Sequence, residues 1–552
     1  MASSPCPCSP CTAGLSNSTA REKASTFGVS GMVARALVWA VFPVTLALAI
    51  TRQSLWIDEG FTVWFASHKS FHSFLSVLVG SPGAAGDPQL IFYLFHIWMW
   101  IKIFGQSELA LRAANIPFAI VFIGTMVWAS RRLFWHRNLW ILFCLSPFFW
   151  FYLNEARPYA AVLAFSSVSS VALLAYLTDP EQYRKWAPWI CLIALFFAFG
   201  MHILAVLLVP SLLVLAAAAI AGNPKIRSVF WRDWVRPVLW CLPAYIALGL
   251  FYVRVSAYGV NKVDGYPGLK NLAYALYEFT GFAGLGPPRN DMRESQSLSV
   301  FMPYLPWLLL GAAALLLAAF SVLRTRWPNL LKYLFLSIAA GVAVAMLVFI
   351  AQRFQALGRH MAVFFPLVLM TLMLRPNRGF LSPMQFRRAA AALVALGTVW
   401  AVSDFRLVLM DKYQKDSYRE ACSISLEKVS SDGAKILWAA NPHTADYYGL
   451  QIRQDNNPSA ISANRGIDWP VRAEGIGVQN WSYEQAKAYL DTASEPTLLV
   501  LSKADNFDQN SAWSTLVQQQ HPEKIAKLHA FAIYEWQPKK VARTSPLPSP
   551  AS

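Results

Sequence analysis

Long apolar runs separated by short polar links fill most of this chain. Runs of about 17 to 25 residues suffice to cross ~30 Å of hydrocarbon as helices. They lie at 33–50, 88–104, 110–130, 138–153, 159–177, 187–221, 235–253, 303–323, 330–350, 358–374 and 389–409. The 187–221 run is too long for one upright helix and breaks most naturally near Gly200-Met201-His202. The pattern predicts a polytopic α-helical membrane protein with about 11 to 13 transmembrane helices.

Polar composition returns in a few segments that we expect outside the membrane. Two are loops, at 51–87 and at 254–302, and the second has Gly284 to Pro288 as its flexible centre. Residues 33–409 form the predicted transmembrane domain between a Ser/Pro-rich leader, 1–32, and a polar region from 410 onward. The leader and the end at 539–552 have the composition of disordered segments.

The region 410–538 reads as a small soluble α/β domain. Lys435 to Ala440 and Thr497 to Ser502 have the pattern of short buried strands, and Ala530 to Trp536 offers a final one. Ser482 followed by Gln485 has the spacing of a helix capping box. Strands that alternate with helices favour an α/β fold.

Composition supports the membrane interpretation and excludes other classes. Of 552 residues, 56% are hydrophobic and only 14% are charged. The net charge of +17 comes from Lys and Arg in short links such as 131–137 and 225–236, which is typical of topogenic charge and of contact with anionic lipids. Nucleic acid is therefore not an expected partner. The seven cysteines form no disulfide framework, and Cys6, Cys8 and Cys11 of the leader lack a fourth metal ligand.

The order of the spans predicts which segments share a side. With the N-terminus inside, the loop 51–87 lies outside, and eleven crossings also place residues 410–552 outside. The basic links at 131–137 and 222–236 both have cytoplasmic character. Simple alternation puts the first of them outside, so one of the expected spans conflicts with the charge pattern.

The loop after the first span carries the candidate chemistry. Asp58 and Glu59 stand at its start, and Asp87 stands at its end, next to the following helix. Between them, aromatic and aliphatic residues interleave with polar ones from Phe61 to Val79, as in an amphipathic helix at a membrane interface. Three carboxylates can thus share one pocket at the membrane surface. The alternative is a solvated pair of acids with no task.

Four short motifs at helix ends give this loop a context. They are Ile57 to Phe61, Asp87 to Leu94, Phe104 to Arg112 and Asn154 to Ala160. In this order the chain resembles the polytopic GT-C glycosyltransferases of the family 39 type, which include protein O-mannosyltransferases and the lipid A aminoarabinose transferase. The resemblance covers residues 33 to 210 and extends to the rest by architecture.

The resemblance implies transfer of a sugar from a polyprenyl phosphate to an acceptor hydroxyl, with inversion in one displacement. It makes Asp58 the catalytic base and Glu59 its partner, either as a metal ligand or as an orienting group. A divalent metal held by Asp58, Glu59 and Asp87 is left open, and no cofactor is certain. The family usually has His or Lys before two prolines where this chain has Asp87-Pro88-Gln89, so the role of Asp87 is also open.

Positive charge has to stabilise the departing lipid phosphate. Arg157 is the first candidate, because Arg grips phosphate oxygens bidentately; pairing with Glu155 or contact with lipid head groups is its alternative. The remaining candidates are His202, Arg353, Arg359, His360 and Arg112. Packing for His202 and membrane anchoring for Arg353, Arg359 and His360 are the competing interpretations.

Two other classes of protein remain open at this point. A transporter or lipid-carrier flippase uses buried carboxylates as ion or proton relays, and a scaffold uses its terminal domain to bind a partner. Transporters usually place acids near the bilayer midplane and contain internal repeats, and we find no repeat. We expect a glycosyltransferase of the bacterial inner (plasma) membrane with its site facing outside. The acceptor can be a lipid, a glycan or a protein, and the sugar is not predicted.

Overall fold

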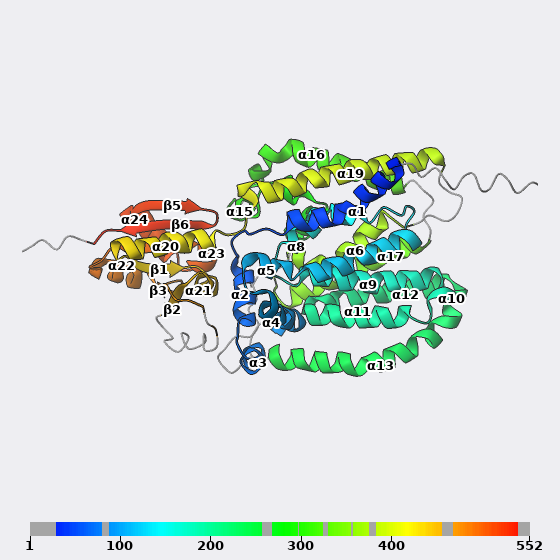
Figure 1. Cartoon of the computed structure of the whole chain (residues 1–552), viewed down its shortest axis with the longest axis horizontal. Helices are drawn as coiled ribbons and strands as arrows, with labels where there is room; N and C mark the ends of the chain where they lie inside the picture. The colour runs from blue at the N-terminus through cyan, green and yellow to red at the C-terminus, as the bar shows by residue number, and fades with distance from the viewer. Residues whose placement is uncertain are drawn as a thin grey trace, which may run out of the picture.

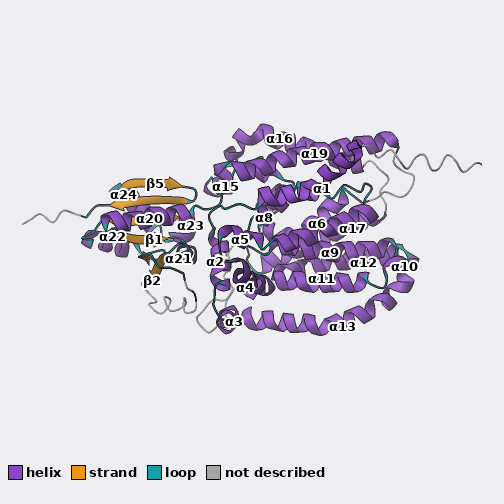
Figure 2. Ribbon diagram, viewed as in Figure 1, coloured by secondary structure: helices purple, strands orange, loops and turns teal. Residues whose placement is uncertain are grey.

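The chain folds into a long bundle of helices with a smaller α/β domain at one end (Figures 1 and 2). This computed structural model describes residues 29–79, 88–256, 268–295, 297–323, 329–354, 357–374, 382–454, 467 and 469–538. Asp87, most of the leader with its three cysteines, and the end at 539–552 lie outside the described residues.

The bundle is built from helices that follow the apolar runs. They are α1 (Val29–Ala49), α2 (Ile57–Ala66), α3 (Phe71–Val79), α4 (Ile91–Phe104), α5 (Glu108–Ala113), α6 (Ile116–Arg132), α7 (Ile141–Cys144), α8 (Pro147–Leu153), α9 (Tyr159–Thr178), α10 (Pro180–Tyr183), α11 (Ala187–Met201), α12 (Leu208–Gly222), α13 (Pro224–Ser256), α14 (Leu269–Phe279), α15 (Arg289–Glu294), α16 (Leu305–Leu323), α17 (Asn329–Ala351), α18 (Phe365–Thr371) and α19 (Pro383–Leu409). Short 3-10 segments η2 (Pro88–Leu90), η3 (Ile203–Leu207), η4 (Phe282–Gly284), η5 (Leu298–Tyr304) and η6 (Gly358–Phe364) join some of them.

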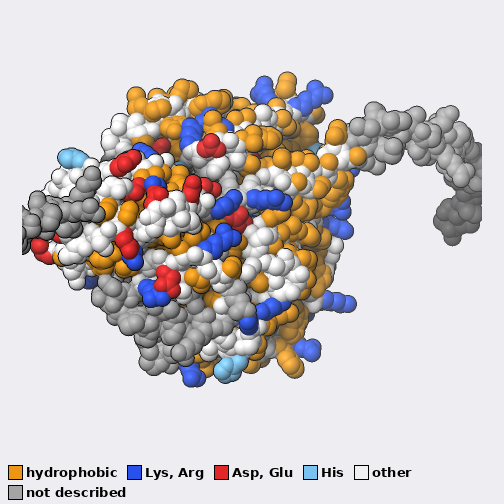
Figure 3. All heavy atoms as spheres, turned by 60° about the vertical axis from the view of Figure 1, so that its left-hand side comes forward, with side chains coloured by type: hydrophobic (Ala, Val, Ile, Leu, Met, Phe, Trp, Pro, Cys, Tyr) orange, Lys and Arg blue, Asp and Glu red, His pale blue; other side chains and the backbone are white. Residues whose placement is uncertain are grey.

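The bundle has the surface of an integral membrane protein. Within the described ranges, seven helices are long and apolar enough to cross a membrane, and four shorter apolar helices accompany them. Large apolar side chains such as Leu316, Leu347 and Leu250 are exposed on its outside, where lipid replaces water. Figure 3 shows apolar side chains over the bundle, whereas charged ones gather on the C-terminal domain. The polytopic helical class with a small α/β domain is confirmed.

Several of the expected spans are interrupted, and in two of them the reason is visible. The 187–221 run breaks at His202, whose backbone is extended (φ −155°, ψ 128°), so α11 and α12 are separate helices joined by η3, as expected. The 138–153 run, expected as one helix, forms α7 and α8 instead. Pro147 starts α8 at its first turn, where proline's missing N–H costs nothing, and the extended Ser146 before it ends the previous helix.

Helix α4 corrects the expected span at 88–104, because both of its ends lie at the end of the bundle that carries Asp58. At its start, the ring of Phe92 fills the space beside Gly200. After its last turn, the backbone carbonyl of Gln106 accepts a hydrogen bond of 2.8 Å from Tyr447 of the C-terminal domain. Figure 1 shows α4 nearly end-on, while α9 and α11 run the length of the bundle.

This placement of α4 explains why simple alternation of the spans put the basic link 131–137 on the opposite side from the link 222–236. Because α4 does not traverse the bundle, α6 runs away from Asp58 and ends in the basic link 131–137 (Figure 1). The basic segment 222–236, which the structure places at the end of α12 and in the first turns of α13, lies at the same far end (Figure 1). One expected crossing is lost at α4, and the split of 187–221 adds one. The acidic pair and the C-terminal domain consequently share one end, as the expectation of eleven crossings requires.

The C-terminal domain is a six-stranded mixed sheet with helices on both faces. Its elements are α20 (Tyr418–Asp432), β1 (Lys435–Ala439), α21 (Pro442–Tyr447), β2 (Leu450–Gln454), β3 (Ala473–Gly477), α22 (Tyr483–Thr492), β4 (Thr497–Ser502), α23 (Ala504–Phe507), α24 (Ala512–Gln520), β5 (Glu523–Leu528) and β6 (Phe531–Trp536). The strand order is β2-β3-β1-β4-β6-β5, with β6 antiparallel to both of its neighbours and the other pairs parallel. The expected strands and the Ser482 capping box are all present.

Each face of this sheet has its own apolar core. One contains Trp438 and Phe531 with Tyr418 of α20. The other contains Leu437 and Leu499 with helices α22 and α24. Alternate residues of β1 thus point to opposite faces, as strand geometry requires.

The domain docks on α2, the helix that carries Asp58 and Glu59. Helix α21 lies against it, and a Cβ placed on Gly60 would stand 1.9 Å from Thr444 Oγ1, so only glycine allows this approach. The ring of His443 packs against Trp64, with 4.5 Å between ring centroids. Arg419 pairs with Glu108 of α5 at 2.8 Å. Apolar packing and charge pairing together fix the domain to the end of the bundle.

The segment from Gly284 to Pro288, expected as a flexible centre of the loop 254–302, is buried. Gly284 N–H donates to Ser403 Oγ at 3.1 Å, and its carbonyl accepts from Arg406 Nε at 2.7 Å. Helix α19 therefore supplies partners for the backbone that the glycine and proline residues leave without secondary structure.

Candidate functional site

Asp58 and Glu59 begin α2, which lies between the bundle and the C-terminal domain. The helix forms because Trp56 is extended and Glu59, three residues on, reaches back to the Trp56 N–H at 3.4 Å. Adjacent residues on a helix point about 100° apart. The two carboxylates therefore have different surroundings, and the structure gives them different partners.

Glu59 is fully buried and bound to Arg112 of α5. Arg112 Nε donates to Glu59 Oε1 at 3.0 Å and Nη2 donates to Oε2 at 2.9 Å, a bidentate pair with both side chains fully buried. The other N–H groups of Arg112 donate to the carbonyls of Thr51, Gln53 and Ser54 at 3.1, 2.7 and 3.1 Å. All five donors of Arg112 are thus engaged, two by Glu59 and three by the loop that precedes α2, and none remains for a phosphate.

A second cation reaches Glu59 from the segment after the last bundle helix. Lys415 Nζ lies 3.3 Å from Glu59 Oε1 and also donates to the Asn154 carbonyl. The Ala156 N–H donates to the same carboxylate oxygen at 2.8 Å. Burial raises the pKa of Glu59, but Arg112 and Lys415 outweigh it and lower that pKa to about 2. Burial lowers the pKa of Lys415 to about 8, partly offset by Glu59.

Asp58 is the more accessible of the two acids. Its side chain is 23% exposed, and its Oδ2 accepts from Arg359 Nη1 at 2.8 Å. Burial raises the pKa of Asp58, and the charges of Arg359, Arg157 and Lys503 together lower it below its ordinary value. Asp58 is consequently ionised at neutral pH and is shared between cations from three separate parts of the chain.

Arg157 lies on the inner side of Asp58. It is 9% exposed, and its Nη1 lies 3.4 Å from the Asp58 carbonyl and 3.2 Å from Thr62 Oγ1. Pro158 caps α9 beside it. The structure thus places Arg157 and Arg359, which are far apart in sequence, beside the same residue, with Arg359 at the carboxylate of Asp58 and Arg157 at its backbone carbonyl.

The two histidine candidates lie at the same end of the bundle. His202 is buried at the break between α11 and α12, and its Nδ1 accepts from the Leu204 N–H at 3.1 Å. His360 Nδ1 accepts from the Leu357 N–H at 2.9 Å, and its Nε2 lies 3.4 Å from Arg359 Nε. His360 therefore supports the side chain of Arg359. Arg353 is exposed in the turn after α17, with φ at 49°.

Sequence reasoning did not single out Glu278, Arg289 and Tyr152, which form a second charged group beside this site. Arg289 pairs with Glu278, whose other oxygen accepts from Tyr152 at 3.3 Å. A Cβ on Gly358 would stand 1.8 Å from Glu278 Oε2, so this group lies directly against the backbone next to Arg359. Arg289 and Glu278 come from the loop 254–302, which showed its charge in the sequence but no motif.

Glu155 and Lys503 are further residues whose place the sequence did not reveal. Glu155 is 1% exposed, and its Oε2 has no hydrogen-bond partner among the described residues. Burial raises the pKa of Glu155, so this acid tends toward its neutral form. Lys503, at the end of β4, pairs with the buried Asp416 at 2.6 Å. Of these two residues, only Glu155 could have been noticed in the sequence, because it belongs to the motif Asn154 to Ala160.

The described residues do not fit a metal ion shared by Asp58 and Glu59. Both oxygens of Glu59 already accept from Arg112, and one of them also accepts from Lys415 and Ala156. Within the described ranges, no group of three or more His, Cys, Asp or Glu side chains is placed to hold a metal. Asp87 lies outside these ranges.

The fold and the site together define an integral, polytopic membrane protein with an ionised carboxylate among arginines at one end of its bundle. No family model matches the sequence, and no curated protein matches it. Similar solved structures include two of ArnT from Cupriavidus metallidurans. The one bound to undecaprenyl phosphate has 12% identity and a TM-score of 0.48, and the apo structure has 13% and 0.44. Each comparison covers 92% of this chain and 98% of the other.

Proposed function

We propose that this chain is a membrane glycosyltransferase that moves a sugar from a polyprenyl-phosphate donor to an acceptor hydroxyl by a single inverting displacement. The observation that carries the proposal is the partly exposed, ionised Asp58, whose carboxylate pairs with Arg359 and whose backbone carbonyl accepts from Arg157. Inverting transfer needs a base and a phosphate cradle within reach of each other. The motif series that resembles the family 39 type of GT-C glycosyltransferase supports the same assignment.

Asp58 serves as the base for the acceptor. The hydroxyl proton passes to Asp58 while the acceptor oxygen bonds to the anomeric carbon, and the bond from that carbon to the phosphate oxygen breaks. The products are the glycosylated acceptor, the polyprenyl phosphate and a protonated Asp58, which returns its proton to water. The acceptor oxygen has to lie about 3 Å from the carboxylate, and the exposed fraction of Asp58 leaves room for it.

Arg359 links the two halves of this step. Before transfer it balances the charge of Asp58 at 2.8 Å. As Asp58 gains its proton and loses its charge, the leaving phosphate gains one. Arg359 is then free to donate to the phosphate, together with Arg157, and fixed donors of this kind are effective because they need no reorganisation. Glu59 does not react but orients the helix, because Arg112 binds both of its carboxylate oxygens and Lys415 binds one of them.

A substitution of Asp58 tests the proposal. We expect Asp58→Asn, in purified protein, to lower the release of polyprenyl phosphate from a panel of polyprenyl-phosphate sugars by about 10²- to 10⁴-fold, the usual value of general-base catalysis. Asp432→Asn is the matched control, because Asp432 lies at the surface of the C-terminal domain. Mass spectrometry of the lipid products measures release.

The same experiment distinguishes this function from a flippase. Release by the Asp58→Asn protein at the wild-type rate would refute the catalytic assignment. Movement of intact polyprenyl-phosphate sugar across a vesicle membrane, without any cleavage, would establish transport instead. Comparison of the envelope lipids and glycans of cells with and without the protein then identifies the sugar and the acceptor.

A further inference from the structure

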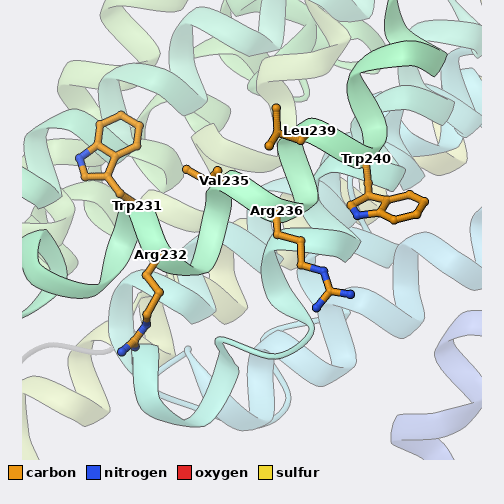
Figure 4. Close-up of a pocket in the computed structure, with 6 residues that line it drawn as sticks. All are labelled: Trp231, Arg232, Val235, Arg236, Leu239 and Trp240. Atoms are coloured by element: carbon orange, nitrogen blue, oxygen red, sulfur yellow. The ribbon is translucent and has the colours of Figure 1, made fainter.

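Helix α13 carries an open hollow on its outer face, far from Asp58. The hollow has a volume of about 530 Å³ and is lined by residues of this one helix, which Figure 4 shows as sticks. Trp231, Val235 and Leu239 form one row along the helix, and Arg232, Arg236 and Trp240 form the adjacent row. Residues four apart align into ridges with a groove between them. One wall of this groove is apolar, and the other is cationic.

The hollow lies at the end of the bundle opposite the candidate site. Near the hollow, Tyr176 at the end of α9 donates to Asp233 at 3.1 Å. At the other end of α13, Tyr252 donates to the Phe199 carbonyl at 2.8 Å, close to the break at His202. Since His202 lies at the Asp58 end, the groove belongs to the other side of the membrane.

The charges along α13 set its depth in the bilayer. Between Arg236 and Arg254 the helix has no charged residue, which gives about 25 Å of apolar helix, close to the thickness of the hydrocarbon. Lys225, Arg227, Arg232 and Arg236 precede this stretch. Arg236 is therefore at the level of the lipid head groups, and Trp240 is just below it, where amphipathic rings are favoured.

The groove side chains are available to a lipid. Trp231 and Trp240 are 66% and 70% exposed, and no other described element covers them. Asp233 accepts from Arg232 Nε at 3.1 Å and so offsets part of one charge, while Tyr176 binds the other oxygen of Asp233. Arg232 and Arg236 are both exposed and extend from the same side of α13 (Figure 4).

We propose that this groove binds one anionic phospholipid of the leaflet opposite the candidate site. Arg232 and Arg236, one helical turn apart, hold the head-group phosphate, since a guanidinium group matches phosphate geometry. Trp231 lies beside the head group, and Trp240, one turn deeper than Arg236, lies beside the glycerol region. An acyl chain continues past Leu239 along the exposed apolar face of α13, toward the bilayer centre. A zwitterionic lipid lacks the net charge that the cationic row selects.

The test counts lipids bound to the detergent-purified full chain by native mass spectrometry. Phosphatidylglycerol and phosphatidylcholine are titrated separately. Each basic residue near an anionic lipid surface contributes about 1 kcal/mol of binding free energy. Loss of both arginines should therefore weaken binding on the order of 10- to 30-fold. We therefore expect this loss of phosphatidylglycerol affinity in Arg232→Gln/Arg236→Gln. Arg387→Gln/Arg388→Gln is the matched control: it removes two exposed charges of α19 and should bind as wild type does.

Further outcomes decide the proposal. An equal loss of phosphatidylglycerol affinity in both double variants would overturn the proposal, because binding would then depend only on the overall surface charge. Equal affinity of the wild type for the two lipids would also overturn it. The variant Trp231→Ala/Trp240→Ala keeps the charge and removes the aromatic walls, so unchanged phosphatidylglycerol affinity in it shows that the groove is not the site. A cross-linked dimer that disappears in this variant identifies a second copy of the chain as the occupant, which also overturns the proposal.

Discussion

Replacement of Glu59 by glutamine removes one charge from the most enclosed ion cluster of the site. Gln has nearly the same shape, so the cavity is unchanged, but Arg112 and Lys415 lose their shared counter-charge. Breaking a buried pair by removing one partner typically costs about 3 to 5 kcal/mol, because the remaining charge stays buried. We expect Glu59→Gln to destabilise the folded protein by an amount in this range.

The pKa of Glu59 gives a separate measure of the same interaction. Its value falls from 4.5 to about 2 in the folded protein, and this difference corresponds to about 3 kcal/mol. Because the folded pKa is the lower one, this stability is present above pH 4.5 and is lost as the pH falls toward 2. About 2 kcal/mol of it is gone by pH 3. The two routes to the magnitude agree.

The assay is unfolding of the full chain in one detergent, followed by tryptophan fluorescence at pH 6 and at pH 3. We expect a large gap in unfolding free energy between wild type and Glu59→Gln at pH 6, and a gap about 2 kcal/mol smaller at pH 3. Glu474→Gln is the control, since Glu474 and its partner Arg453 are about half exposed and such pairs contribute little. A gap that does not shrink at low pH, or a Glu59 variant no weaker than the control, would refute the reasoning.

Three further substitutions test the parts around Asp58. Gly60→Ala places a methyl group 1.9 Å from Thr444 Oγ1, so the C-terminal domain should dock less tightly and proteolysis between α19 and α20 should accelerate several-fold, by overpacking of about 1 to 3 kcal/mol. Gly358→Ala meets Glu278 Oε2 at 1.8 Å and should lower sugar transfer without releasing the domain. Arg157→Ala should raise the donor concentration needed for half-maximal transfer about tenfold or more, with the acceptor requirement unchanged.

One control serves both glycine variants. A Cβ on Gly124 of α6 meets nothing within 4 Å, so Gly124→Ala should leave proteolysis and transfer as in wild type. Equal protease sensitivity in the Gly60 and Gly124 variants would show that the domain does not depend on that close approach. If the Arg157 variant changes the acceptor requirement and not the donor requirement, the arginine does not hold the donor.

The apolar pattern predicted the bundle well, because a membrane helix is specified mainly by its own composition. The break at His202 was visible as a polar residue in an overlong run. Helix α4 was not predictable in the same way. Its composition is that of a crossing helix, and only its contacts with Gly200 and with Tyr447 show that both ends lie on one side. The mismatch of the basic links was the one local sign of this in the sequence.

The candidate site was predicted in part, through residues that stand in motifs. Asp58, Arg157 and Arg359 stood out as charges at helix ends, and the fold brings them together. Lys415 and Lys503 were not found, because each lies in an ordinary polar segment of the C-terminal region. Their contribution depends on how that region folds back onto α2, a long-range contact that no local pattern encodes. The donors of Arg112, which sequence reasoning had assigned to phosphate, bind Glu59 and the carbonyls of Thr51, Gln53 and Ser54 instead.

The two adjacent acids have different roles, and the geometry of the helix explains the difference. A turn of about 100° between neighbouring residues points Glu59 inward, to the fully buried Arg112, and leaves Asp58 at the partly open edge beside Arg359. Glu59 holds the start of α2 in a fixed position because its partners come from α5, from the segment after α8 and from the segment after α19. In the function that we propose, Asp58 meets both an acceptor hydroxyl and the donor phosphate, and that role needs such a fixed support. Exchange of the two residues, as Asp58→Glu/Glu59→Asp, keeps every charge but shortens the buried side chain that binds Arg112. We therefore expect this variant to lose folding stability more than it loses the rate of sugar transfer per folded molecule.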